Sequence, residues 1–96
     1  MTVNVTFFIE ESCLDDTLIQ NLCRYNQGFT VIPTIGFWEG KRENSYMLLI
    51  GFDNSLLTDC INEVKQSGIR HGQKAIGVDY GRGYENIDCN EVNTNE

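Results

Sequence analysis

The sequence is poor in basic residues and in long apolar runs. It has seven Lys and Arg against fourteen Asp and Glu, which gives a formal net charge of −7. This charge repels nucleic-acid phosphates and anionic lipids, so we expect neither nucleic acid nor a membrane as a partner, and it suits a cationic ligand or a basic partner. No segment approaches the roughly 18 apolar residues of a membrane span, and the N-terminus has no signal-peptide pattern, so we expect a cytoplasmic protein.

Metal and disulfide patterns are also missing. The four cysteines show no C-x-x-C or Cys/His ligand spacing, which argues against both a zinc site and a disulfide framework. We expect reduced thiols that pack in or near the core. A chain of 96 residues forms one small domain with a modest core, and self-association would stabilise it.

Hydrophobic periodicity predicts a strand followed by a helix in the first part of the chain. Apolar residues alternate with a period of two over residues 3–9, as in a strand with one face on a core. Ser12 is a candidate N-cap, with Asp15 as its acidic partner, for a helix that begins near Cys13. The helix buries an apolar stripe and stops before Gly28.

The middle of the chain predicts a hairpin. Residues 29–38 and 45–52 are rich in β-formers, and the Glu39–Arg42 segment between them reads as a loop of about four residues. Pro33 cannot donate a ladder hydrogen bond, which favours an edge strand or a bulge.

A second helix, a fourth strand and a tail complete the predicted order. Asp53 or Asn54 caps a helix with an apolar stripe that ends at Gly68, and residues 75–78 are short, apolar and β-compatible. We predict an α+β, ferredoxin-like βαββαβ domain over residues 1–80, with a four-stranded antiparallel sheet and two helices on one face. Residues 81–96 read as an acidic polar tail. The sheet face without helices, which carries Phe8, predicts sheet-to-sheet oligomers.

The predicted hairpin gathers groups that could bind an organic cation. With a four-residue loop, Trp38 stands opposite Glu43, and Ser45 follows on the same side of its strand. Gly36 leaves backbone open beside the indole. An indole face attracts cations and a carboxylate binds an ammonium group, so together they suit an organic cation. The alternative is a solvent-facing pair in which Lys41 or Arg42 neutralises Glu43.

Other conspicuous residues have ordinary explanations. His71 lies in a glycine-rich loop without a nucleophile or a carboxylate at a suitable spacing, which is typical of a surface loop. The Gly77–Gly83 segment lacks the Lys-Ser/Thr pair of a phosphate loop and reads as a turn after a strand. Asp15 and Asp16 fall in the first turn of a helix, where acidic groups complement the helix dipole.

The segment Gly36–Ser45 resembles a G-x-[aromatic]-x-G-x-x-E-x-S hairpin of the small bacteriophage S-adenosylmethionine (SAM) lyases, long called SAM hydrolases. The Gly72–Ile76 segment is similar to their Gln-containing entry into the last strand. The likeness spans residues 1–80 as an order of elements and about ten residues as a motif. It implies a ferredoxin-like subunit similar to PII signalling proteins, assembled as a trimer with ligand sites between subunits.

The resemblance also implies an activity and a site. SAM would be cleaved to methylthioadenosine and homoserine lactone without metal or cofactor, depleting the methyl donor that host restriction needs, in the cytoplasm of the infected cell. Glu43 would be the catalytic residue that holds the substrate ammonium. The implied substrate-binding residues are Trp38, Gly36, Ser45, Gln73 and Tyr80.

One position departs from the family pattern. Trp38 stands where the lyases are expected to carry a tyrosine, and Tyr80 could replace that phenol only from the last strand or from a neighbouring subunit. The alternative function is therefore a non-enzymatic oligomer that sequesters a small ligand or inhibits a host protein.

Overall fold

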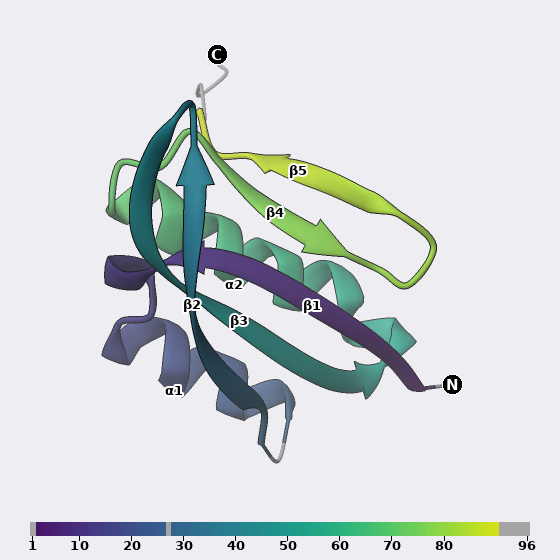
Figure 1. Cartoon of the computed structure of the whole chain (residues 1–96). Coiled ribbons are helices and arrows are strands. Elements are labelled where there is room, and N and C mark those ends of the chain that lie inside the picture. The colour runs from purple at the N-terminus through teal and green to yellow at the C-terminus, as the bar shows by residue number, and fades with distance from the viewer. Residues whose placement is uncertain (1, 27, 91–96) are drawn as a thin grey trace.

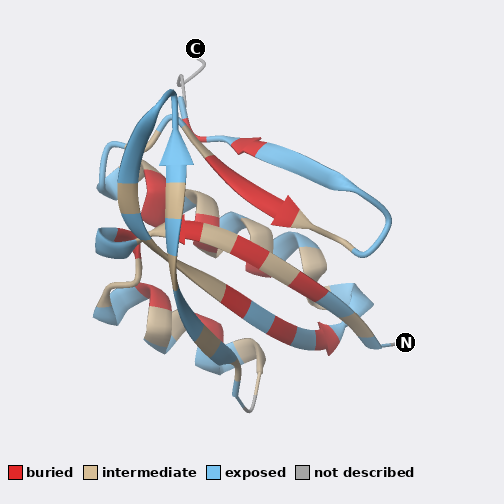
Figure 2. Cartoon of the chain, viewed as in Figure 1, coloured by how far each residue is buried: buried red, intermediate tan, exposed pale blue. Residues whose placement is uncertain are grey.

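The alternating first strand fixes which face of the sheet is buried. In the computed structural model, which describes residues 2–26 and 28–90, β1 (Thr2–Glu10) buries Val5, Phe7 and Ile9. β3 (Lys41–Asp53) pairs with it antiparallel and buries Leu48, Ile50 and Phe52 on the same side. Figure 2 shows this alternation as red segments separated by paler ones along both strands. The period of two therefore gives the sheet one core face and one open face.

Five strands form a single antiparallel sheet in the order β2-β3-β1-β4-β5. The remaining elements are η1 (Glu11–Cys13), α1 (Asp16–Tyr25), β2 (Thr30–Trp38), η2 (Asn54–Leu56), α2 (Leu57–Arg70), β4 (Ala75–Asp79) and β5 (Tyr84–Asp88). Both helices lie on the core face (Figure 1). The α+β class and the order of elements through β4 are confirmed. Pro33 lies in the edge strand β2, as predicted.

The prediction of four strands is wrong by one. Residues 84–88, expected to belong to the polar tail, form β5 and pair with β4 from Ala75–Asp88 to Asp79–Tyr84. β5 buries Ile87, and Cys89 directly after it is also buried. Residues 80–83 make the turn predicted after β4, and residues 91–96 of the expected tail lie outside the described residues.

The helix boundaries differ from the predicted ones by a few residues. Ser12 lies in the 3-10 turn η1, and Asp15 is the residue that caps α1, with its carboxylate accepting from the Leu18 N–H at 2.8 Å. Asp53 caps η2 rather than α2 itself, by accepting from Ser55. Each helix is thus preceded by a 3-10 turn, which hydrophobic periodicity does not report. Asp15 follows the first turn and caps α1, whereas α2 begins after Leu56 without a side-chain cap.

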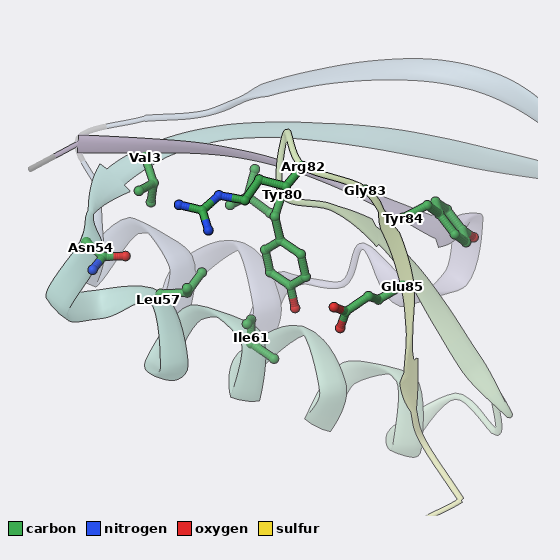
Figure 3. Close-up of a pocket in the computed structure, with 10 residues that line it drawn as sticks. Val3, Asn54, Leu57, Ile61, Tyr80, Arg82, Gly83, Tyr84 and Glu85 are labelled. Carbon is green, nitrogen blue, oxygen red and sulfur yellow. The ribbon is translucent and has the colours of Figure 1, made fainter.

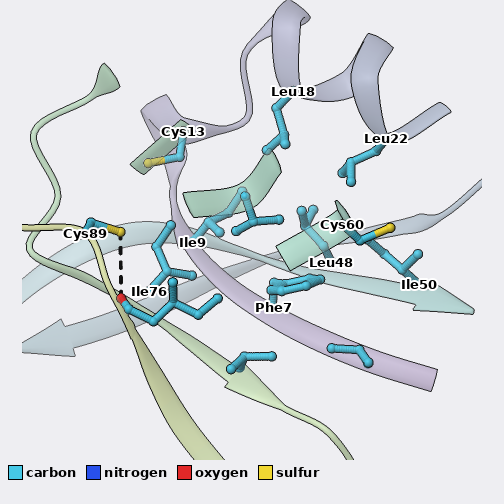
Figure 4. Packing of buried hydrophobic residues seen from close by; sticks show 14 of the residues in the cluster. Phe7, Ile9, Cys13, Leu18, Leu22, Leu48, Ile50, Cys60, Ile76 and Cys89 are labelled. Atoms are coloured by element: carbon cyan, nitrogen blue, oxygen red, sulfur yellow. Dashed lines mark hydrogen bonds between the residues drawn. The ribbon is translucent and has the colours of Figure 1, made fainter. Parts of the chain in front are cut away.

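The core lies between the helices and the sheet (Figure 4). Leu18 and Leu22 of α1 and Val64 of α2 have no solvent-exposed surface. Three cysteines also lie in this core, as predicted, whereas Cys23 is exposed and contradicts that expectation. Among the described residues no helix is long and apolar enough to cross a membrane.

Close packing of α2 against β4 depends on Gly68. A Cβ at Gly68 would lie 2.6 Å from Cys89 Sγ and 2.8 Å from Ile76 Cδ1. Gly68 thus lets the last helical turn approach both β4 and the end of β5.

We therefore expect Gly68→Ala to lower the free energy of unfolding by about 1–2 kcal/mol, because overpacking outweighs the gain in helix propensity. Urea denaturation followed by circular dichroism measures this change. Gln66→Ala, at an exposed position of the same helix, is the matched control and should stay within about 0.5 kcal/mol of the unmodified chain. Equal stability of the two variants would contradict the packing argument.

Candidate functional site

The candidate site lies where the sheet loses its central strand. β1 pairs with β3 as far as Glu10 and Ser45, while the β2–β3 ladder continues to Trp38 and Lys41. At Glu10 the chain leaves the sheet and forms η1. The extended hairpin and the entry to β4 therefore face each other across the space that a longer β1 would fill.

A pocket of about 240 Å³ occupies this end of the sheet. Its wall includes side chains from every strand, because β1 ends there and the hairpin extends past it. The lining residues are Phe8, Ile9, Glu10, Gly36, Phe37, Trp38, Glu43, Ser45, Gln73, Lys74, Ala75, Gly77, Tyr84 and Asn86. Of the six residues predicted for the site, the structure brings five together here, and Tyr80 is the exception.

The hairpin turn is shorter than predicted. Trp38 pairs with Lys41, so the loop consists of Glu39 and Gly40, with φ of 50° and 81°. Positive φ at both positions is what a type I′ turn requires. Glu43 consequently pairs with Gly36 and lies diagonal to Trp38 instead of opposite it. Paired residues share a face, so the indole and the carboxylate still emerge on the same side.

Two carboxylates line the pocket, and only one is engaged. Glu10 accepts hydrogen bonds from the Ser12 backbone N–H, at 3.0 Å, and from the Ser12 hydroxyl. Within residues 2–26 and 28–90 Glu43 forms no hydrogen bond or ion pair, and neither Lys41 nor Arg42 neutralises it. Glu43 is half-buried, and its carboxylate is available to a ligand.

Gly36 and Ser45 lie in the pocket wall beside Glu43. A Cβ at Gly36 would lie 3.1 Å from Ser45 Oγ, so the hydroxyl occupies the space beside the glycine. The predicted support of Glu43 by Ser45 stays a prediction, since the described contacts include no hydrogen bond between them. Gln73 reaches the pocket from the segment before β4, where its N–H donates to the Gly68 carbonyl at 2.9 Å.

Tyr80 lines a different hollow, of about 580 Å³, on the core side of the sheet. Its walls include apolar residues of β1 and α2. The Glu85 carboxylate lies near the Tyr80 hydroxyl, and the Arg82 guanidinium extends towards Val3 (Figure 3). Burial, and then the negative charge of Glu85, raise the pKa of Tyr80. Within one chain Tyr80 therefore lies on the other side of the sheet from Glu43.

Sequence reasoning missed four polar residues of the pocket: Glu10, Lys74, Tyr84 and Asn86. Tyr84 and Asn86 belong to β5, whose apolar content is too low to reveal a strand. Lys74 directly precedes β4 and brings a positive charge to the rim. No hydrophobic period marks β5, because Ile87 is its only aliphatic residue.

The thiols of the core are poor nucleophiles. Burial, followed by the charge of Glu10, raises the pKa of Cys13 to about 11, and burial also raises the pKa values of Cys60 and Cys89. A thiol with a raised pKa carries little thiolate near neutral pH. These cysteines have a packing role.

His71 and Asp15 form a structural clamp between the helices. Asp15 Oδ2 lies 2.7 Å from His71 Nε2, and Arg70 Nη2 lies 3.1 Å from Asp15 Oδ1. Partial burial opposes ionisation of Asp15, but hydrogen bonds from Arg70, the Leu18 N–H and His71 outweigh it and hold the Asp15 pKa well below its usual range. The clamp joins the start of α1 to the end of α2.

This clamp predicts a pH-dependent effect of Asp15→Asn, which keeps a capping oxygen but removes the charge. A carboxylate with a lowered folded-state pKa stabilises the fold above its unfolded pKa of about 4, and this contribution is lost as pH falls through the folded pKa. Asp15→Asn should therefore lower the midpoint of urea unfolding at pH 7, with a difference that shrinks steadily below about pH 4. Asp16→Asn, one residue later and exposed, is the control. A difference that does not change with pH would contradict the clamp.

Comparison with known proteins supports the fold. No family model and no curated protein matches the sequence. The structure is similar to a phage SAM lyase in complex with S-methyl-5'-thioadenosine, with a TM-score of 0.64 and 15% identity over 91% of this chain and 89% of the other. It is equally similar to a phage SAM lyase in the apo state, with a TM-score of 0.64 and 14% identity over 94% and 91% of the two chains. The resemblance noted in the hairpin is therefore confirmed at the level of the fold.

Proposed function

We propose that this protein binds SAM in the pocket around Glu43 and cleaves it to methylthioadenosine and homoserine lactone. The observation that carries the proposal is the gathering of Trp38, Glu43 and Gln73 in one pocket on the open face. The shared fold with phage SAM lyases, one of them bound to S-methyl-5'-thioadenosine, supports the same ligand class. Removal of the methyl donor would counter methyl-dependent defence in the cytoplasm of a phage-infected cell.

The reaction asks this chain mainly to bind and orient one molecule. A carboxylate oxygen of the substrate attacks its own γ-carbon, the carbon–sulfur bond breaks, and the sulfonium sulfur keeps the electron pair. No proton has to move, so holding the two ends in an attack geometry can supply a large part of the rate, up to about 7–11 kcal/mol in favourable cases. In this scheme Glu43 holds the ammonium group, and Trp38 faces a cationic part of the substrate.

The pocket suits a site that a second subunit completes. Its volume of about 240 Å³ is below the roughly 300–1,000 Å³ of most small-molecule sites. The open face around it also exposes large apolar side chains, including Ile32, Trp38 and Leu49. We propose that the ferredoxin-like subunits assemble as a trimer and that a neighbouring subunit closes the pocket. Tyr80 could join the site only from such a neighbour.

Assembly is tested by sedimentation equilibrium of the whole chain. We expect a mass close to three times 10.9 kDa at micromolar concentration. Leu49→Glu places a charge on the open face away from the pocket lining, so it should shift the equilibrium towards the monomer. Arg42→Glu is the control, because Arg42 alternates with the open-face residues of the hairpin and so belongs to the opposite face. A chain that remains monomeric at high concentration would contradict a shared site.

The proposed activity is tested with Glu43→Gln. The unmodified protein is incubated with SAM, and methylthioadenosine and homoserine lactone are quantified by chromatography. Loss of a charge-assisted hydrogen bond to the substrate ammonium should reduce kcat/KM by about 10-fold to 100-fold. Glu39→Gln, in the turn of the same hairpin, makes the same chemical change outside the pocket and should keep full activity.

A second candidate function is favoured by the indole at position 38. The phenol implied by the family motif is missing from this position, and Tyr80 lies on the other side of the sheet within one chain. Such a site could bind the ligand without turnover, as a sequestering or inhibitory oligomer would. Tight binding of SAM by calorimetry with no methylthioadenosine formed would favour this function over the lyase.

A further inference from the structure

Tyr84 lies flat over a glycine on the open face of the sheet. A Cβ at Gly77 would lie 2.0 Å from Tyr84 Oη and 2.6 Å from Tyr84 Cζ, so the ring occupies the place of a side chain at Gly77. The Tyr84 and Phe8 ring centroids are 5.9 Å apart, with planes inclined at 47°. Gly77 below and Phe8 beside it therefore fix the position of the ring.

The other face of the Tyr84 ring is open. The residue is 60% exposed although Gly77 beneath it is buried. Tyr84 borders both hollows, but its ring points away from Tyr80 (Figure 3) and lines the pocket that also contains Trp38 and Glu43. An aromatic ring held on one side and exposed on the other is a ready surface for stacking, because little side-chain entropy remains to be lost.

We propose that Tyr84 is the stacking platform for the purine ring of the ligand, and that Gly77 is a specificity-determining residue because it seats that platform. This inference rests on the proposed ligand class and adds the residue that recognises its base. Every base has a π face that stacks on aromatic side chains. Glu43, on the hairpin side of the same pocket, remains for the ammonium end. The two ends of the ligand would then be held by opposite walls, β5 and β3.

The test measures binding of S-methyl-5'-thioadenosine, which carries the purine but lacks the amino-acid end. Calorimetry gives the affinity, and the fluorescence of Trp38, the single tryptophan, reports occupancy of the pocket independently. We expect Tyr84→Leu to weaken binding about tenfold, because the ring face is lost. Tyr84→Phe keeps that face and should stay within about twofold. Ile35→Ala, another exposed apolar truncation outside this pocket, should leave binding unchanged.

Gly77→Ala tests separately whether the position of the Tyr84 ring depends on the absence of a side chain at Gly77. The clashing atoms are the movable end of the Tyr84 side chain, so the ring must swing away while the strand can stay in place. We expect binding to weaken about as much as in Tyr84→Leu. Combining the two substitutions should add little, because Gly77→Ala acts only through the ring. Thermal unfolding of each variant verifies that the fold is retained.

The outcomes separate this inference from the lyase proposal. Unchanged affinity in Tyr84→Leu overturns the platform even if the protein cleaves SAM. An equal loss in Tyr84→Phe and Tyr84→Leu also overturns it, since the hydroxyl would then matter and not the ring face. Failure of the unmodified protein to bind S-methyl-5'-thioadenosine overturns it as well. The expected series in a protein that releases no product from SAM supports the platform and overturns only the lyase.

Discussion

The position of β1 between β3 and β4 is the constraint on which the rest of the structure depends. Its odd-numbered apolar residues face the helices, so a slip of one residue would expose Phe7 and bury polar residues such as Asn4 and Thr6. Burial thus sets the register, and the register sets which residues of β3 and β4 reach the open face. The same strand creates the pocket by ending at Glu10, because the hairpin continues where β1 does not. Core and site are consequences of one strand's pattern and length.

Much of the fold could be predicted because its strongest signals are local. The alternation in β1 and the apolar stripes of both helices are long enough to identify element types without tertiary information. β5 gave no such signal, since among its five residues only Ile87 is buried. Its place in the sheet depends on pairing with β4 and on Tyr84 covering Gly77, and these are contacts that periodicity does not encode. β5 also carries Tyr84 and Asn86, so the sequence-based prediction of the pocket did not include the wall that these residues form.

Trp38 and Glu43 share a face of the sheet, as predicted, although the predicted length of the hairpin loop was wrong. Glu39 occupies a left-handed conformation that favours Gly, Asn or Asp, so nothing in Glu-Gly identified a two-residue turn. The expected loop was two residues too long, and an even error moves a residue along its strand without moving it to the other face. Trp38 and Glu43 were therefore placed on the correct side although their pairing was wrong. An error of one residue would have put them on opposite faces.

The charge of the chain bears on how the site would select its ligand. Glu10 accepts hydrogen bonds from Ser12 through Oε1, whereas Glu43 forms no hydrogen bond or ion pair within the described residues, and Lys74 at the rim offers the opposite charge. A ligand with both an ammonium and a carboxylate could meet both groups, whereas a simple cation would meet Glu43 and be repelled by Lys74. Such a pair of opposite charges discriminates by the arrangement of charge within the ligand as well as by its net charge. The net negative charge of the chain would then attract cations in general, and Glu43 together with Lys74 would determine which of them binds in the pocket.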